Sequence, residues 1–110
     1  MTPAEIEAAH RCAMSLADDG DRLLKAGKPD AARVCYVEAL AAERDAAMAT
    51  TTQPSRAILL RSAAWLAVNA GDHAEALRLA DLGLADPTTM EREYYELQAV
   101  AQAAAKETAP

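Results

Sequence analysis

Few residues in this 110-residue chain have the types and spacing that catalysis or metal binding requires. Glu7 and His10 lie three positions apart, so in a helix they would share one face at a spacing that metal sites use. A metal site needs further ligands, and no second pair of this kind accompanies the first. The other histidine, His73, is far along the chain. We therefore predict that no metal is bound.

Three aspartates, Asp18, Asp19 and Asp21, form a cluster that could attract a cation. They lack the alternating ligand pattern and the distal glutamate of a calcium loop, so a solvated helix face is the favoured interpretation. The chain also has no glycine-rich phosphate loop and no GxSxG motif. We therefore expect no catalytic residues, no cofactor and no enzymatic activity.

Cys12 and Cys35 are the two cysteines of the chain. If the surrounding segments form a helical hairpin that turns near Gly27, Cys35 should face residue 19 or 20. Cys12 would then lie about 10 Å too far along the helix axis for a disulfide. We expect both cysteines to be small, buried, unbonded hydrophobic residues.

Composition and charge restrict the class of protein. Hydrophobic residues make up 52% of the chain but many are alanine, phenylalanine is absent, and β-branched residues are sparse, so close-packed helices are favoured over strands. The net charge of −6 argues against nucleic acid or an anionic membrane as the main partner. Neither a membrane-spanning stretch nor a signal peptide is recognisable, which predicts a cytoplasmic protein.

The apolar spacing and the capping signals predict an all-α fold of about five antiparallel helices joined by tight turns. The first helix should begin after Thr2, whose capping box includes Glu5, and end at Gly27, with a kink allowed at 18–21. Further helices are expected from Pro29 to Met48 or beyond, from about Pro54 or Ser55 to Ala70, from a cap at Asp72 to Asp86, and from a cap at Thr88 to about Lys106, where the tail should fray.

Two segments of the sequence repeat each other. Residues 25–41 (KAGKPDAARVCYVEALA) and 69–85 (NAGDHAEALRLADLGLA) align without a gap and share Gly27/Gly71, Ala32/Ala76 and Leu40/Leu84. Each copy reads as helix, glycine turn, helix. The glycines are 44 positions apart, so about ten extra residues, around 44–53, must form either an extension of the second helix or a loop.

This pattern resembles the tetratricopeptide repeat (TPR), a helical hairpin with small residues at its helix crossings. The first copy, 13–46, has Gly20, Gly27, Ala32, Tyr36 and Ala39 at the motif positions. The second copy, 57–90, whose hairpin covers 57–85, has Ala64, Gly71, Ala76, Ala80 and Gly83. The whole chain, 1–110, would be one TPR-like domain with a capping helix at 88–106. A plain alanine-rich helical bundle is the alternative, because glycine and alanine are common.

The resemblance implies a protein-interaction module, an adaptor or scaffold, that binds a peptide or protein surface between its first and third helices. Carrying over the family's groove positions gives these partner-binding residues: Asp21, Lys25, Arg61, Trp65 and Asn69. A structural homodimer through the first or fifth helix, or a small regulatory inhibitor of another protein, remain alternatives. Residues 51–72 are also similar to a segment of short bacterial TPR-like proteins, which implies a bacterial cytoplasm.

Overall fold

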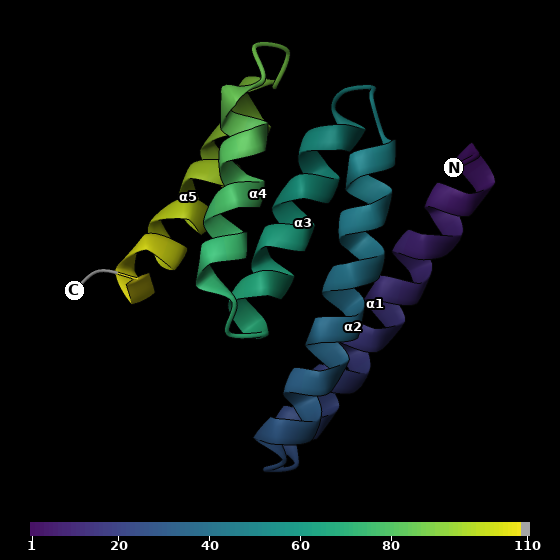
Figure 1. Ribbon diagram of the computed structural model, residues 1–110, viewed down its shortest axis with the longest axis vertical. Coiled ribbons are helices and arrows are strands. Elements are labelled where there is room, and N and C mark those ends of the chain that lie inside the picture. Colours follow the sequence, from purple (N-terminus) through teal and green to yellow (C-terminus); the bar gives the residue numbers. More distant parts are fainter. Residues whose placement is uncertain (109–110) are drawn as a thin grey trace.

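The computed structural model describes residues 1–108, and these residues form five α-helices and no strand (Figure 1). The helices are α1 (Pro3–Lys25), α2 (Pro29–Ala49), α3 (Ser55–Asn69), α4 (His73–Ala85) and α5 (Glu91–Thr108). Consecutive helices run in opposite directions in Figure 1, from the purple N-terminus to the yellow α5. The expected all-α class and the five helices are therefore confirmed.

The hydrogen bonds at the helix starts confirm two of the three N-terminal caps that the sequence predicts. Thr2 Oγ1 accepts from the Glu5 amide at 3.1 Å while Glu5 Oε1 accepts from the Thr2 amide at 2.9 Å, which completes the expected capping box. Asp72 caps α4 by accepting from the Glu75 amide. The expected cap at Thr88 is wrong. The Thr88 hydroxyl donates to Asp86 instead, and α5 begins three residues later, at Glu91.

The two glycine turns of the repeat have the same geometry. Gly27 and Gly71 have φ angles of 76° and 82°, a left-handed conformation that favours glycine. After each glycine, the next amide donates back to the fifth residue before it, from Lys28 to Leu23 and from Asp72 to Ala67. This 6→1 bond defines the Schellman ending of a helix. The sequence repeat is therefore also a repeat of local structure.

The first helix runs without interruption through 18–21, where the sequence allows a kink. Gly20 lies inside this helix, and the ring of Tyr36 packs close against it. A Cβ at position 20 would lie 2.8 Å from Tyr36 Cε1. The absence of a side chain at Gly20 makes room for the Tyr36 ring between α1 and α2.

The extra residues between the repeat copies lengthen α2. It has 21 residues, against 13 in the corresponding α4. It ends at Ala49, and the Thr50 hydroxyl donates to the Ala46 carbonyl at the end of the helix. Of the two alternatives for the connection, an extended helix is the one that the structure contains. Within the described residues, α5 reaches Thr108, two residues beyond its expected end at Lys106, and the rest of the tail, 109–110, lies outside the described residues.

The helices form a flat molecule with principal extents of 41 × 40 × 18 Å. The thickness is about two helix diameters. The substantial interfaces join α1 to α2, α2 to α3, α3 to α4, α4 to α5, and α3 to α5. The α1–α2 hairpin projects beyond the α3–α4 turn in Figure 1, and α1 lies behind α2. The core is rich in alanine, with Leu60, Leu79 and Leu97 as its largest fully buried apolar residues.

The cysteines do not lie where the sequence suggested. Cys12 is exposed and Cys35 is partly exposed, so the expectation that both are buried is wrong. Cys12 precedes the buried Ala13, and Cys35 precedes the buried Tyr36. Each cysteine therefore lies at the edge of the buried face of its helix, and that face is narrower than the spacing of apolar residues indicated. Both thiols are unbonded, as expected.

No helix within residues 1–108 combines the length and the apolar character needed to cross a membrane.

Candidate binding cleft between α1 and α3

A buried carboxylate connects three helices. Glu43, on α2, is 0% exposed. His10 Nδ1, on α1, lies 2.8 Å from Glu43 Oε1 and 3.0 Å from Oε2, and the Ser62 hydroxyl, on α3, lies 2.5 Å from Oε2. A carboxylate accepts hydrogen bonds, so both the imidazole and the hydroxyl act as donors. Glu43 therefore holds α1 and α3 to α2.

The order of these three groups matters for what they can do chemically. An activated serine needs a base that accepts its proton, with the carboxylate behind that base. Here the Ser62 hydroxyl donates straight to Glu43, and the carboxylate lies between Ser62 and His10. The arrangement does not activate the hydroxyl, and its geometry suits the positioning of helices.

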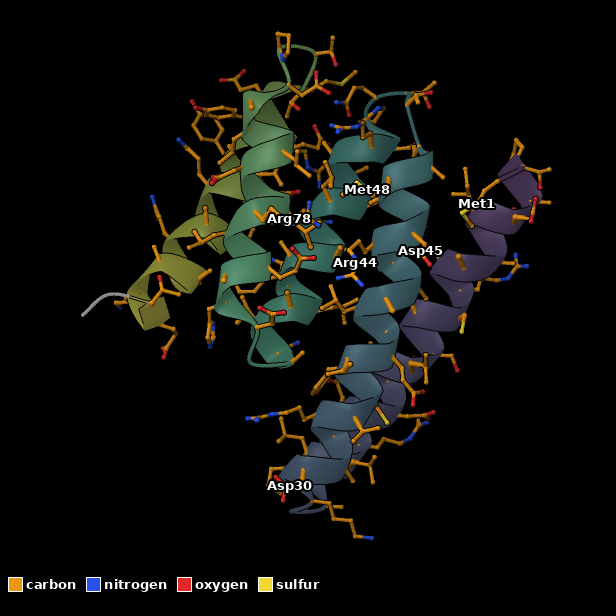
Figure 2. All side chains as sticks on the ribbon, in the orientation of Figure 1. Met1, Asp30, Arg44, Asp45, Met48 and Arg78 are labelled. Atoms are coloured by element: carbon orange, nitrogen blue, oxygen red, sulfur yellow. The ribbon has the colours of Figure 1, made fainter. Side chains whose placement is uncertain are left out.

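A cleft opens next to this cluster, between the first turns of α1 and the first turn of α3. Its volume is about 540 Å³. Its walls are apolar, mainly Ile6 and Ile58, while His10 and Glu7 add polar groups from α1. The end of α2 and the connection to α3 close it on the third side through residues 49–52. Figure 2 shows the Met1 side chain at the open end, pointing toward α2.

Three of the five predicted binding residues lie on α3. Arg61, Trp65 and Asn69 follow each other at intervals of four and therefore share a face. Arg61 Nε lies 3.2 Å from Glu96 Oε2 on α5, an ion-pair distance without the geometry of a hydrogen bond. Trp65 is 38% exposed, and Asn69 is exposed. This face therefore looks out beside α5.

The other two predicted residues lie near the tip of the α1–α2 hairpin. Asp21 accepts a hydrogen bond from the Tyr36 hydroxyl at 2.5 Å. Lys25 is the last residue of α1 and is exposed. Both belong to the first helical hairpin, and their contacts are with α2 or with solvent rather than with Arg61, Trp65 or Asn69.

The length of α2 explains why the predicted binding residues of α1 lie apart from those of α3. The ungapped repeat pairs positions 44 apart, which would place Asp21 level with Trp65. In the structure, His10 and Ser62 share one carboxylate although they are 52 positions apart. The start of α3 therefore lies beside the first half of α1, and the cleft forms from Ile6 and Ile58. Whether the five predicted residues bind a partner stays a prediction.

Sequence reasoning missed the cluster of His10, Glu43 and Ser62. A glutamate within a helix normally indicates a solvated face. Its position along the helix could have indicated burial, because Glu43 lies three or four residues from four apolar residues that are all buried: Ala39, Leu40, Ala46 and Ala47. A charged residue inside such an apolar stripe predicts a buried polar contact.

A second charged cluster connects α2 to α4. Arg44 lies 2.8 Å from Glu75, and Arg78 contacts the same carboxylate. The hydrogen bond from Arg78, supported by Arg44, lowers the pKa of Glu75 below its usual value of 4.5. Glu75 therefore remains ionised and offsets the charge of the two arginines.

Within residues 1–108, no three histidine, cysteine, aspartate or glutamate side chains gather as ligands for a metal ion. Comparisons of the chain with models of protein families, with curated proteins and with solved structures gave no match.

Proposed function

We propose that this protein is a TPR-like interaction module that binds a segment of another protein in the cleft between α1 and α3. The observation that carries the proposal is the cleft of about 540 Å³ with apolar walls from two different helices. Clefts that bind ligands combine apolar walls with a few polar groups. Here Ile6 and Ile58 supply the apolar walls, and His10 supplies a polar group held in place by Glu43.

The repeat supports the TPR-like part of the proposal. The small residues at its motif positions, such as Ala32 and Ala76, are buried at 1% and 0% exposure, where helices meet. Ala64 and Ala80 of the second copy are also 0% exposed, at the positions of Gly20 and Tyr36 in the first copy. A helix-crossing role for small residues is what the TPR resemblance implies.

The geometry favours a short segment with one apolar anchor side chain over a carboxylate clamp. Cationic clamps need several lysines or arginines, whereas Arg61 is already paired with Glu96 and Lys25 lies at the hairpin tip. An adaptor and a small regulatory partner of another protein would use the cleft in the same way. We propose no catalytic step.

Two unbonded thiols and the resemblance of residues 51–72 support a reducing, bacterial-type cytoplasm.

The test is a selection of peptides from a random display library on the immobilised protein, followed by titration of the selected peptides in solution. Amide chemical shifts report binding, and a change in the fluorescence of Trp65, which lies outside the cleft lining, would show that a bound segment continues along α3. Ile58→Glu places a charge on the apolar wall and should weaken binding at least tenfold. Tyr95→Glu is the matched control, because Tyr95 is 61% exposed on α5, outside the cleft lining.

Shift changes confined to the cleft residues, with loss of binding in Ile58→Glu alone, would support the proposal. A further variant, Arg61→Glu with Asn69→Ala, asks whether a bound segment continues along α3. Selected peptides that bind Ile58→Glu as tightly as the wild type would place the function on another surface.

A further inference from the structure

The outward face of α2 carries an apolar stripe that no other helix within residues 1–108 covers. Val34, Val37 and Met48 are 58%, 51% and 45% exposed, and Ala41 is exposed between them. Spacings of three, four and seven residues place these four side chains in one line, as in the seam of a coiled coil. A hollow of about 350 Å³ lies over Val34 and Val37.

The two edges of this stripe carry opposite charges. At about 100° per residue, Glu38 and Asp45 flank it on one side and Arg33 flanks it on the other. Arg44, seven residues after Val37, falls in the line of the stripe, but its side chain is held by Glu75 of α4. Figure 2 shows Arg44 and Asp45 on opposite sides of α2, with Arg44 turned toward α4. Apart from Arg44, the stripe is therefore apolar along its centre, with two acidic residues along one edge and Arg33 along the other.

The charges differ in whether they already have partners. Arg44 is paired with Glu75, so it does not add a free cation to the seam. Within residues 1–108, Arg33, Glu38 and Asp45 form no ion pair, and the Arg33 guanidinium lies against Gly71 at the turn between α3 and α4. A binding partner that offers both an anion and a cation at the right spacing would satisfy Arg33 and Glu38 together.

We propose that the occupant of this face is the same face of a second copy of the chain, with the two α2 helices parallel around a two-fold axis. Arg33 and Glu38 are five positions apart, the spacing at which charges flanking the seam pair between parallel helices. The two-fold axis brings Arg33 of each copy to Glu38 of the other. The interface then contains two equivalent ion pairs between Arg33 and Glu38, and the valines of the two copies pack against each other across the axis.

Charge also decides against the antiparallel arrangement. An axis perpendicular to α2 would place the acidic edge against the acidic edge of the second copy, and like charges so placed repel. The small Ala41 in the middle lets the backbones approach. The seam covers only about two heptads, so we expect a weak dimer, with a dissociation constant of roughly 10–100 µM.

The first experiment measures the molecular mass by sedimentation equilibrium from about 5 µM to about 500 µM, a range chosen to bracket that constant. The wild type should shift from monomer to dimer. Val37→Asp should stay monomeric, since it places a charge in the seam. Tyr95→Asp, which changes another exposed apolar residue, on α5, is the matched control and should dimerise like the wild type.

The second experiment uses charge reversal to fix the geometry. In the parallel dimer, Glu38→Arg alone places two arginines opposite each other, and Arg33→Glu alone places two glutamates opposite each other. Each variant should weaken self-association about tenfold. When the two variants are mixed, both arginines of the Glu38→Arg chain face glutamates of the Arg33→Glu chain, so the mixture should form a heterodimer even though each variant alone associates weakly. The double variant, with both reversals in one chain, restores both ion pairs and should dimerise like the wild type. Circular dichroism of each variant checks that it remains folded.

The outcomes separate the alternatives. A wild type that stays monomeric at the highest concentration overturns the proposal. A dimer that survives Val37→Asp uses another face, such as α5, and also overturns it. If Glu38→Arg associates with itself as well as the wild type does, and binds the wild-type chain more tightly than itself, the helices are antiparallel and the proposed geometry is wrong. None of these results bears on peptide binding in the α1–α3 cleft, whose lining shares no residue with this stripe.

Discussion

His10 Nδ1 on α1 binds both carboxylate oxygens of Glu43 on α2, at 2.8 and 3.0 Å, although the carboxylate is completely buried. The imidazole is 41% exposed and remains partly in water at the edge of the cleft. The pair therefore connects the wall of the candidate site to the interior. Its role can be measured separately from any binding activity.

We expect His10→Ala to destabilise the protein by about 1.5–3 kcal/mol, because the buried carboxylate loses a strong donor. In a Glu43→Leu background, the same substitution should cost little, since no acceptor remains. Urea unfolding followed by Trp65 fluorescence gives the four free energies of this double-mutant cycle. Arg11→Ala, which removes an exposed ion pair with Glu7 from the same helix, should change stability by less than about 0.5 kcal/mol. Equal costs of His10→Ala in both backgrounds would contradict the structural role of the pair.

The hydrogen bond between Tyr36 and Asp21 predicts a loss of stability in alkali. This bond, followed by burial, raises the pKa of Tyr36 from 10 to about 12. A folded-state pKa above the unfolded one stabilises the fold fully below pH 10, and that contribution disappears as the pH rises toward 12. The stability difference between wild type and Tyr36→Phe should therefore be constant up to about pH 9.5 and then shrink. Denaturant unfolding at a series of pH values measures it, and a difference that does not change with pH would contradict the prediction.

The close contact between Gly20 and Tyr36 predicts a substitution whose effect changes sign. Gly20→Ala places a Cβ 2.8 Å from Tyr36 Cε1, and the overpacking should outweigh the better helix propensity of alanine, for a net loss of about 1 kcal/mol. In a Tyr36→Ala background, Gly20→Ala should instead stabilise the protein by about 1 kcal/mol. Thermal and urea unfolding of the four variants test this, and destabilisation in both backgrounds would show that the ring is not the cause.

The different exposure of the two thiols predicts their reactivity. Cys12 is exposed and Cys35 is only partly exposed, so a disulfide reagent should modify Cys12 first. Removing the fast phase with Cys12→Ser should leave a single slower phase from Cys35. Colour release in native buffer, compared with the same reaction in denaturant, measures both rates. Two equally fast thiols in the native protein would place Cys35 closer to the surface than the structure does.

Several features of the fold could be predicted because they depend on short-range interactions. The capping box of Thr2 and Glu5 and the left-handed glycines at 27 and 71 involve residues a few positions apart. Apolar spacing likewise identifies helices without knowledge of their partners. The prediction failed at Thr88 because this residue belongs to a turn, in which its amide and its hydroxyl both donate to Asp86, and α5 begins only at Glu91.

The order of residues along the chain was enough to specify the five helices, the two repeated glycine turns and the alanine-rich character of their contacts, since local hydrogen bonds and helix propensity act within one segment. Packing in three dimensions settled which parts of α1 and α3 lie side by side. The long α2 shifts the start of α3 to the level of His10, and this places Ile6 opposite Ile58 and buries Glu43 between α1 and α3. That register depends on contacts between distant segments, which spacing along the chain does not encode.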